Sequence, residues 1–260
     1  LMERLGLPQD GGYDPIKLTK STEKIVIDGN KRKYTNLARN LRFYGGIISA
    51  TEVGCNLRCK FCFSHDPVKK PKTTGKFYSP QEVFNALSSA AYKKGYKLIS
   101  ASASEGTLGK QHLFELLELV DKSDLVYILE TNGMTLGSDP EFCKQLARFK
   151  NLHVRVSIKG CTEDEYIKLT NAKRSSYQLP YKAINNLIEN KVSCNACLSI
   201  SFSKEDDINI AKQKLYKIAP GILKSLELEY ITLFPKVLKE LTKHKLKPNK
   251  VRSFGRIVRV

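Results

Sequence analysis

The chain has 260 residues, of which 41% are apolar and 27% are charged, and this balance excludes a disordered or low-complexity protein. No apolar run approaches the roughly 20 residues of a membrane helix, and the first ten residues lack the apolar region of a signal peptide. Lys and Arg outnumber Asp and Glu by 44 to 26, and the resulting net charge of +18 favours either a polyanionic partner such as RNA or a lysine-rich solvated surface. Seven cysteines in a chain of this kind indicate a reducing compartment, so we expect a cytoplasmic protein without membrane association.

Six apolar or alternating runs, each typical of a strand, are spread along the chain. They are residues 47–50, 97–103, 124–130, 152–158, 196–202 and 226–231. Helical patterns lie between them, and four have the Ser/Thr-x-x-Asp/Glu spacing of a helix N-terminus, at Ser79, Ser138, Thr162 and Ser203. Repeated strand–helix alternation predicts an α/β fold with a parallel sheet. Six units predict a partial (β/α)6 barrel, with its chemistry at the C-terminal ends of the strands.

Two short extensions flank the predicted barrel core of residues 46–233. In residues 1–45 we expect a β-hairpin, in which residues 23–27 turn at Asp28-Gly29-Asn30 into residues 31–38. This hairpin either covers one edge of the sheet or contacts the substrate. Residues 234–260 hold nine Lys or Arg residues and one acid, Glu240, so they form a basic C-terminal extension.

The most informative segment is a cysteine loop that follows the first predicted barrel strand. Cys55, Cys59 and Cys62 lie within eight residues. Three thiolates bind three irons of a [4Fe–4S] cluster and leave the fourth iron open to a substrate or cofactor. Alternatively, His65 completes a structural zinc site through the spacing Cys59-x2-Cys62-x2-His65. The spacing alone leaves both metal sites open.

The C-x3-C-x2-C pattern, with the aromatic Phe61 before its last cysteine, resembles the signature of the radical S-adenosylmethionine (radical SAM) superfamily. The resemblance covers roughly residues 46–233 and implies a partial barrel of six strand–helix units. It implies that Cys55, Cys59 and Cys62 hold a [4Fe–4S] cluster whose open iron binds S-adenosylmethionine (SAM). It also implies reductive cleavage of SAM to methionine and a 5′-deoxyadenosyl radical, which abstracts a hydrogen atom from the substrate. A low-potential electron donor of the flavodoxin or ferredoxin type is implied as a partner.

The end of the second predicted strand resembles a SAM-binding segment of this superfamily. Ser104 and Glu105 match part of the Gly-Gly-Glu-Pro motif, which binds the SAM amino group. Ala103 and Ser104 replace the two glycines, and Gly106 replaces the proline. The resemblance therefore implies Ser104 and Glu105 as cofactor-binding residues, with a departure in the detailed geometry of the turn.

Later strand ends add further candidate SAM ligands. Thr131 and Asn132 resemble the segment that contacts the SAM ribose. Ser157 and Lys159 match the Asp-x-Lys segment of activating enzymes for glycyl-radical enzymes, with Ser in place of Asp, and either is a candidate ligand of the SAM carboxylate. Alternatively, Lys159 is a surface lysine that is exposed to solvent and binds no cofactor. Ser201 lies on a period-two polar face of the next strand, which suits a cofactor if that face points into the barrel.

Four further cysteines lie outside the cysteine loop. They are Cys143, Cys161, Cys194 and Cys197. We expect core positions rather than a second cluster, because Cys194 and Cys197 would point to opposite faces of a strand and no cysteine follows them.

Basic residues gather in three segments, namely residues 31–33, residues 69–76 and the C-terminal extension. If these segments converge at the barrel mouth, RNA becomes a candidate substrate. The prediction is a radical SAM enzyme with an unidentified substrate, and activation of a glycyl-radical enzyme protein is the first hypothesis. Modification of RNA or a small molecule is the second. The third is a non-catalytic nucleic-acid-binding module that holds zinc or a cluster.

Overall fold

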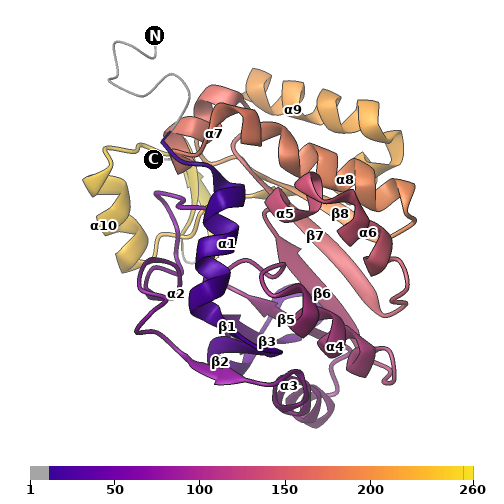
Figure 1. Cartoon of the computed structure of the whole chain (residues 1–260). Coiled ribbons are helices and arrows are strands. Elements are labelled where there is room, and N and C mark those ends of the chain that lie inside the picture. The colour runs from indigo at the N-terminus through magenta and orange to yellow at the C-terminus, as the bar shows by residue number, and fades with distance from the viewer. Residues whose placement is uncertain (1–11, 254, 260) are drawn as a thin grey trace.

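The computed structural model describes residues 12–253 and 255–259, and nine strands in that part form one sheet (Figure 1). Six of them are parallel, in the order β3-β5-β6-β7-β8-β9. Their bounds are β3 (Ile47–Glu52), β5 (Leu98–Ser102), β6 (Val126–Thr131), β7 (Leu152–Lys159), β8 (Cys194–Ser199) and β9 (Glu227–Glu229). Each overlaps one of the six predicted strands, so the predicted partial (β/α)6 barrel is confirmed.

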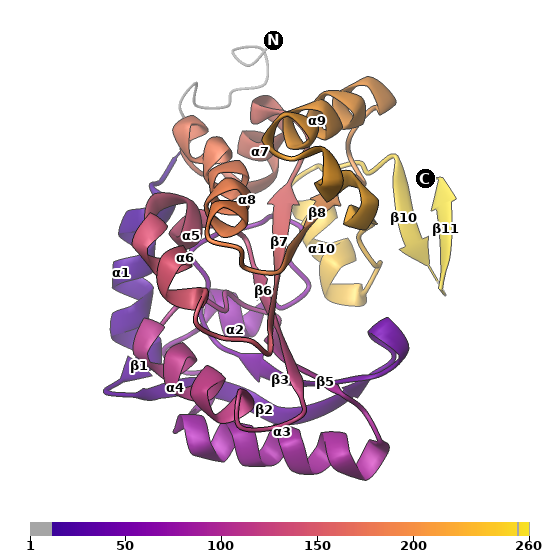
Figure 2. The ribbon, with the colours of Figure 1, turned by 90° about the vertical axis from the view of Figure 1, so that its right-hand side faces the viewer.

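Helices cover one face of this sheet, as Figures 1 and 2 show. They are α3 (Pro80–Lys94), α4 (Lys110–Val120), α5 (Met134–Ser138), α6 (Pro140–Leu146), α7 (Glu163–Thr170), α8 (Leu179–Glu189) and α9 (Glu205–Ile218). On β7, the apolar residues Val154, Val156 and Ile158 belong to the same buried core as Leu187 of α8. The residues that alternate with them are polar and face the inside of the barrel, because side chains of a strand alternate between two faces.

The four predicted helix starts have different outcomes. Ser79 caps α3 and Thr162 caps α7, so these two predictions are confirmed. The prediction at Ser138 is wrong, because the carboxylate of Asp139 caps α6 instead. The prediction at Ser203 is also wrong, because its hydroxyl donates a hydrogen bond to a carboxylate of α7 and α9 begins two residues later.

The described part of the N-terminal segment forms a helix and two strands, and a third, later strand joins them. These are α1 (Pro15–Val26), β1 (Ile27–Asp28), β2 (Lys31–Leu41) and β4 (Lys76–Tyr78), of which β4 comes later in the chain and pairs with β2. The predicted hairpin is present between β1 and β2, but residues 23–26 form the end of α1 and not a strand. The expectation was wrong because Asp14 caps a helix there and Pro15 occupies its first turn. Strand β2 pairs antiparallel with β3 and so extends the edge of the barrel sheet.

The barrel stays open on one side. In the described part of the chain, β9 pairs with β8 but with no strand of the N-terminal segment. Tyr44, in the 3₁₀ helix η2 (Phe43–Gly45), reaches across this gap and donates a hydrogen bond to Glu227 of β9 at 3.3 Å. This contact joins the two edges of the open sheet at the end away from the cysteine loop.

The C-terminal extension contains helix α10 (Pro235–Lys243) and a hairpin of β10 (Lys250–Ser253) and β11 (Arg256–Arg259) (Figure 2). Val237 and Leu241 of α10 form a second buried core with Phe61 of the cysteine loop. The extension therefore packs directly against that loop. Among the described residues, no helix combines the length and apolar character needed to span a bilayer.

Candidate active site

The cysteine loop begins where β3 ends, at the same edge as the C-terminal ends of the other parallel strands. Gly54 has a φ of +93°, a conformation that favours glycine. A Cβ at this position would lie 2.9 Å from the side chain of Thr22 and 3.0 Å from that of Val26, both in α1. Gly54 therefore allows the loop to pass close to α1 on its way over the strand ends.

The three cysteines of the loop are half-buried, and the charges of their thiols interact. Burial is the largest cause that raises the pKa of Cys55, followed by the charges of Glu105 and Cys59. Burial also raises the pKa of Cys59 to about 12, against the opposing effect of Lys159. The charge of Cys59 acts on Cys55 and the charge of Cys62 acts on Cys59, and a bound cation would relieve this repulsion. This donor set fits a metal cluster.

A buried carboxylate joins the ends of β5 and β6 beside this loop. Glu105 is fully buried. Its Oε1 accepts hydrogen bonds from the hydroxyls of Thr107 at 2.7 Å and Thr131 at 2.6 Å, and its Oε2 accepts one from the backbone N–H of Asn132 at 2.8 Å. The structure thus brings together Glu105, Thr131 and Asn132, three of the predicted SAM positions. Protein donors already engage both oxygens of the carboxylate.

Asn132 carries this network into the cysteine loop. Its Nδ2 donates to Oδ1 of Asn56 at 2.7 Å and lies 3.7 Å from the sulfur of Cys55. That sulfur also accepts a hydrogen bond from the backbone N–H of Leu57 at 3.3 Å. Asn56 in turn donates to the hydroxyl of Thr19 in α1 at 3.0 Å. N–H donors of this kind stabilise a thiolate and tune the potential of an iron–sulfur cluster.

The turn before Glu105 departs from the glycine-rich pattern, and the departure has a structural cost. Ala103 has a φ of +73°, in the left-handed region that disfavours residues with a Cβ. The hydroxyl of Ser104 donates to the backbone carbonyl of Glu52 at 2.8 Å. Ser104 is therefore held against the end of β3 rather than grouped with Thr131 and Asn132.

Arg32 of β2 anchors the turn that follows Glu105, and the sequence interpretation missed it. Its buried guanidinium donates to the backbone carbonyls of Glu105 at 2.6 Å, Gly106 at 3.1 Å and Leu108 at 2.7 Å. It also pairs with Glu52 at 3.0 Å. Burial raises the pKa of Glu52 to about 7, although the charge of Arg32 lowers it. Arg32 stood inside a basic segment, and nothing in that segment distinguished it from an exposed cation.

On the other side of the loop, Lys159 lies near Cys59. Its ammonium donates to the hydroxyl of Ser157 at 2.6 Å and lies 3.8 Å from Glu229. Burial lowers the pKa of Lys159, but the charges of Glu229 and Cys59 outweigh it, and the net pKa is raised. Lys159 therefore stays protonated. Its side chain is 19% exposed, so it is neither a solvated surface lysine nor fully enclosed.

The inside of the barrel is lined by paired charges that the sequence interpretation also missed. Arg155 donates to Glu227 at 2.8 Å, to Glu229 at 3.2 Å and to the sulfur of Cys197 at 2.9 Å. Burial raises the pKa of the nearby Glu130 carboxylate. The polar alternation along β7 and β9 was the signal for these residues, which place paired charges on the inner face of the sheet.

Two predicted cofactor residues lie apart from the Glu105 network. Phe61 is 8% exposed, and its ring centroid is 5.7 Å from that of Phe202 in the core closed by α10. Ser201 is buried, and its hydroxyl accepts a hydrogen bond from the backbone N–H of Ile231 at 2.8 Å. The structure gives both residues packing or backbone partners.

The zinc alternative depends on His65, and both ring nitrogens of His65 contact carboxylates. Nδ1 lies 2.8 Å from Asp66 and Nε2 lies 3.5 Å from Glu240. In residues 12–253 and 255–259, no group of three or more His, Cys, Asp or Glu side chains converges on a single metal ion. A cubane binds each thiolate on a separate iron, so it does not require that convergence.

The other cysteines are dispersed. Cys143 and Cys161 are fully buried in the main hydrophobic core, as expected from the sequence. Cys197 faces the barrel interior, and Cys194 at the start of the same strand is half-buried.

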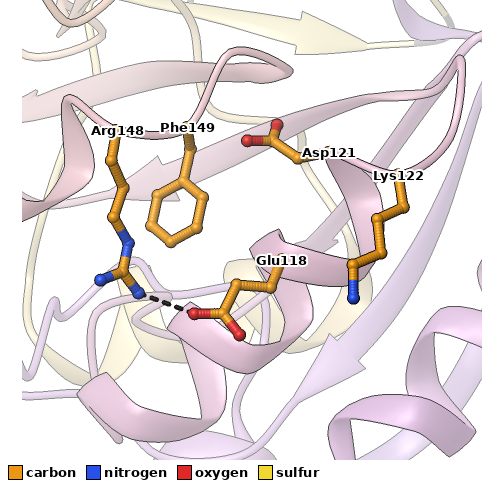
Figure 3. Close-up of a pocket in the computed structure, with 5 residues that line it drawn as sticks. All are labelled: Glu118, Asp121, Lys122, Arg148 and Phe149. Atoms are coloured by element: carbon orange, nitrogen blue, oxygen red, sulfur yellow. Dashed lines mark hydrogen bonds and ion pairs between the residues drawn. The ribbon is translucent and has the colours of Figure 1, made fainter.

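A shallow surface hollow of about 390 Å³ lies at the opposite end of the strands (Figure 3). It is lined by Glu118, Asp121, Lys122, Arg148 and Phe149. Arg148 pairs with Glu118 at 2.8 Å, and Asp121 accepts hydrogen bonds from two backbone N–H groups ahead of β7. These contacts tie the end of α4 to the segment that leads into β7.

Comparison with known proteins identifies a family for this chain. The family model described as "Radical SAM superfamily" matches residues 51–211, which is more than half of the chain. The FeMo cofactor biosynthesis protein NifB of Frankia alni is 28% identical over 155 residues, which cover 57% of this chain and 29% of that protein. A putative glycyl-radical enzyme activating enzyme of Methanocaldococcus jannaschii is 25% identical over 189 residues, which cover 72% of this chain and 62% of that protein. The matched region thus spans less than two thirds of each relative.

Solved structures show the same fold. Streptococcus suis SuiB bound to S-adenosylmethionine superposes with a TM-score of 0.52 at 15% identity, over 66% of this chain and 36% of that chain. TYW1 with a lysine-pyruvate adduct bound superposes with a TM-score of 0.50 at 16% identity, over 94% of this chain and 91% of that chain. At these identities the similarity concerns the fold.

Proposed function

Because this chain belongs to the radical SAM superfamily, we propose that Cys55, Cys59 and Cys62 hold a [4Fe–4S] cluster and that the protein uses SAM to abstract a hydrogen atom from a substrate in the barrel. The superfamily consists of enzymes that use this cluster and SAM. The observation that carries the proposal is the cysteine loop itself. It lies at the edge of the sheet where the chemistry of such barrels occurs, and the charges of neighbouring cysteines are among the causes that raise the pKa of Cys55 and Cys59.

When bound, the reduced cluster supplies the electron that splits SAM into methionine and a 5′-deoxyadenosyl radical. The chain's own residues stabilise the anionic ligands. The N–H groups of Leu57 and Asn132 point to the sulfur of Cys55, and the ammonium of Lys159 lies near Cys59. These groups favour the thiolate form that metal binding requires.

We assign the binding of SAM to both sides of the loop. Lys159, oriented by Ser157, is placed to bind the SAM carboxylate, because it remains charged and partly accessible. Glu105 orients Thr131 and Asn132 through the hydrogen bonds to its carboxylate. Direct contacts of Glu105, Thr131 and Asn132 with SAM stay predictions, as do those of Ser104, Phe61 and Ser201.

The test is anaerobic reconstitution with iron and sulfide, followed by reduction with dithionite in place of a flavodoxin- or ferredoxin-type donor. We expect about four irons per chain and production of 5′-deoxyadenosine from SAM. Single alanine variants of Cys55, Cys59 and Cys62 should lose this product, and Cys194→Ala is the matched control that should keep it. Unchanged product in Cys59→Ala, or one tightly bound zinc and no cluster, would contradict the proposal.

Activation of a glycyl-radical enzyme is the substrate hypothesis that sequence similarity supports. The relative from Methanocaldococcus jannaschii is named a putative enzyme of that kind, and Lys159 matches the lysine of the corresponding segment. The check is to mix the reduced protein, SAM and a glycyl-radical enzyme, and to record the electron paramagnetic resonance spectrum of the partner. A glycyl radical would support activation. SAM cleavage without such a radical would argue for another substrate.

A further inference from the structure

We propose that the surface beside the cysteine loop binds single-stranded nucleic acid and presents it to the barrel mouth. We call this surface the mouth surface and define it as residues 60–72 together with residues 234–243, which include α10. The inference names the substrate class for the proposed function and rests on it. It starts from the convergence of basic segments, the second and third of which are separated by more than 150 residues in the chain.

The first two basic segments touch each other. Lys33 of β2 donates from Nζ to the backbone carbonyls of Pro71 at 3.1 Å and Lys72 at 2.9 Å. Lys33 is only 8% exposed, so it anchors the second segment rather than displaying a charge. Residues 69–72 are therefore held in place, with the lysine side chains of that segment exposed.

The second and third segments also touch. Lys69 forms an ion pair with Glu240 of α10, and Lys236 of α10 lies 3.5 Å from Asp66. Figure 1 shows α2 (Asp66–Lys69) and α10 on the same side of the molecule. The buried residues of α10 face the core, so its lysines at positions 236, 239 and 243 form one exposed stripe.

The positive charge of the mouth surface exceeds its negative charge. It contains seven lysines, namely Lys60, Lys69, Lys70, Lys72, Lys236, Lys239 and Lys243, and two acids, Asp66 and Glu240, so its net charge is 7 − 2 = +5. Each acid already has more than one cationic partner. Asp66 lies near Lys70 and Lys236, and Glu240 lies near Lys69 and His244. Lys60 donates to the backbone carbonyl of Lys168 at 2.7 Å. The exposed Lys72, Lys239 and Lys243 are available to a polyanion.

Exposed aromatic rings distinguish nucleic acid from other polyanions. Phe63, directly after Cys62, is 56% exposed, and Phe234, at the start of α10, is 50% exposed. Their ring centroids are 6.5 Å apart. Unpaired bases stack on rings of this kind, whereas an acidic peptide has no such need and a duplex keeps its bases stacked internally. Phe63 places a stacked base next to the cysteine loop.

The test measures binding to the reconstituted full chain by fluorescence anisotropy, over a series of salt concentrations. The probes are labelled RNA and DNA oligomers of the same sequence and about 12 nucleotides, a duplex of the RNA, and poly-glutamate. The variant Lys239→Glu/Lys243→Glu reverses two charges of the stripe. Lys93→Glu/Lys217→Glu makes the same change of net charge on α3 and α9 and is the matched control.

We expect the stripe variant to weaken binding of the single strand at least tenfold and to lower the salt slope by about two, and the control to bind as the parent does. Phe234→Ala should weaken binding about fivefold or more, with the salt slope unchanged. The RNA and DNA arms show which single strand is preferred. Equal loss in the control variant, equal affinity for the duplex or for poly-glutamate, or an unchanged affinity in Phe234→Ala would overturn the inference.

The same variants separate this inference from the proposed function. None of the substituted residues belongs to the cluster or SAM site, so production of 5′-deoxyadenosine without nucleic acid should match the parent. Loss of SAM cleavage with intact single-strand binding refutes the radical chemistry alone. Intact SAM cleavage with no single-strand binding refutes the mouth surface alone.

Discussion

The two flanks of the cysteine loop satisfy their polar groups in different ways. The closed flank consists of Cys55, Asn132 and Glu105, whose hydrogen bonds are made to other parts of the protein. The open flank consists of Cys59, Cys62 and Lys159, where the lysine is partly exposed and the chain continues into the exposed Phe63. The same short loop thus meets a buried network on one side and accessible charge on the other.

This difference indicates that one flank holds the loop in place and that the other binds ligands. A fully buried carboxylate with several donors cannot move without leaving those donors unsatisfied, which costs about 1–3 kcal/mol for each group. A partly exposed lysine can turn toward a new anion at little cost. The closed flank therefore fixes the loop, and the open flank receives ligands. Four experiments test this difference between the two flanks.

Removal of the central carboxylate should have the largest effect. Glu105→Ala leaves the hydroxyls of Thr107 and Thr131 and the N–H of Asn132 without their acceptor, and we expect a loss of about 3 kcal/mol in the free energy of unfolding. Urea denaturation measures it. Glu118→Ala, which breaks only an exposed ion pair, is the matched control and should lose less than about 1 kcal/mol. Equal losses in the two variants would remove the distinction between the flanks.

Acid should weaken the support of the closed flank. Burial lowers the pKa of His112 to about 4, and its ring nitrogens lie 2.7 Å from the carbonyl oxygen of Asn30 and 2.8 Å from the hydroxyl of Tyr34. The unfolded chain, with a histidine pKa near 6.5, takes up the proton first, so stability falls as pH falls from 6.5 to 4. The full change is about 3 kcal/mol.

The measurement for His112 is the free energy of unfolding at several pH values in the parent and in His112→Gln. Glu52, whose raised pKa of about 7 acts in the opposite direction, is present in both proteins. The difference between the two curves therefore isolates the histidine. Parallel curves between pH 6.5 and 4 would show that His112 does not resist protonation in the folded state.

On the open flank, substitution should alter binding more than stability. Lys159→Ala removes the cation placed for the SAM carboxylate, and we expect the Kd for SAM to rise about tenfold, which corresponds to about 1.4 kcal/mol. Calorimetric titration of the reconstituted protein measures the Kd. Lys182→Ala on the outer helix α8 is the control. An unaltered Kd in Lys159→Ala would show that Lys159 does not contribute to SAM binding.

The smallest effect concerns strain beside the closed flank. Ala103 has a φ of +73°, so Ala103→Gly should relieve the clash of its Cβ and stabilise the protein by about 1 kcal/mol. Thermal unfolding should show a higher Tm. Ala101→Gly in the middle of β5 is the opposite control, because glycine in a strand interior destabilises. A lower Tm in Ala103→Gly would mean that the packing of the Ala103 methyl group stabilises the turn by more than the backbone strain destabilises it.

The elements and motifs that depend on local sequence patterns could be predicted from the sequence. The alternation of residues 152–158 identified β7, and the spacing of Cys55, Cys59 and Cys62 identified the loop. Partners that meet only in three dimensions were missed. Arg32 looked like any cation of a basic run, yet its guanidinium is buried against carbonyls more than 70 residues away. Arg155 finds Glu227 and Glu229 only because β8 lies between their strands.

The contact that spans the open side of the barrel bears on the order in which the molecule folds. Tyr44 and Glu227 are separated by 183 positions in the chain. Their hydrogen bond closes a loop of that length, and pairing of the strands that lie between them in the sheet shortens this loop. Contacts of such separation are closed late on a folding pathway. We therefore expect the seam between η2 and β9 to form late in folding, because its contact carries a high loop-closure cost.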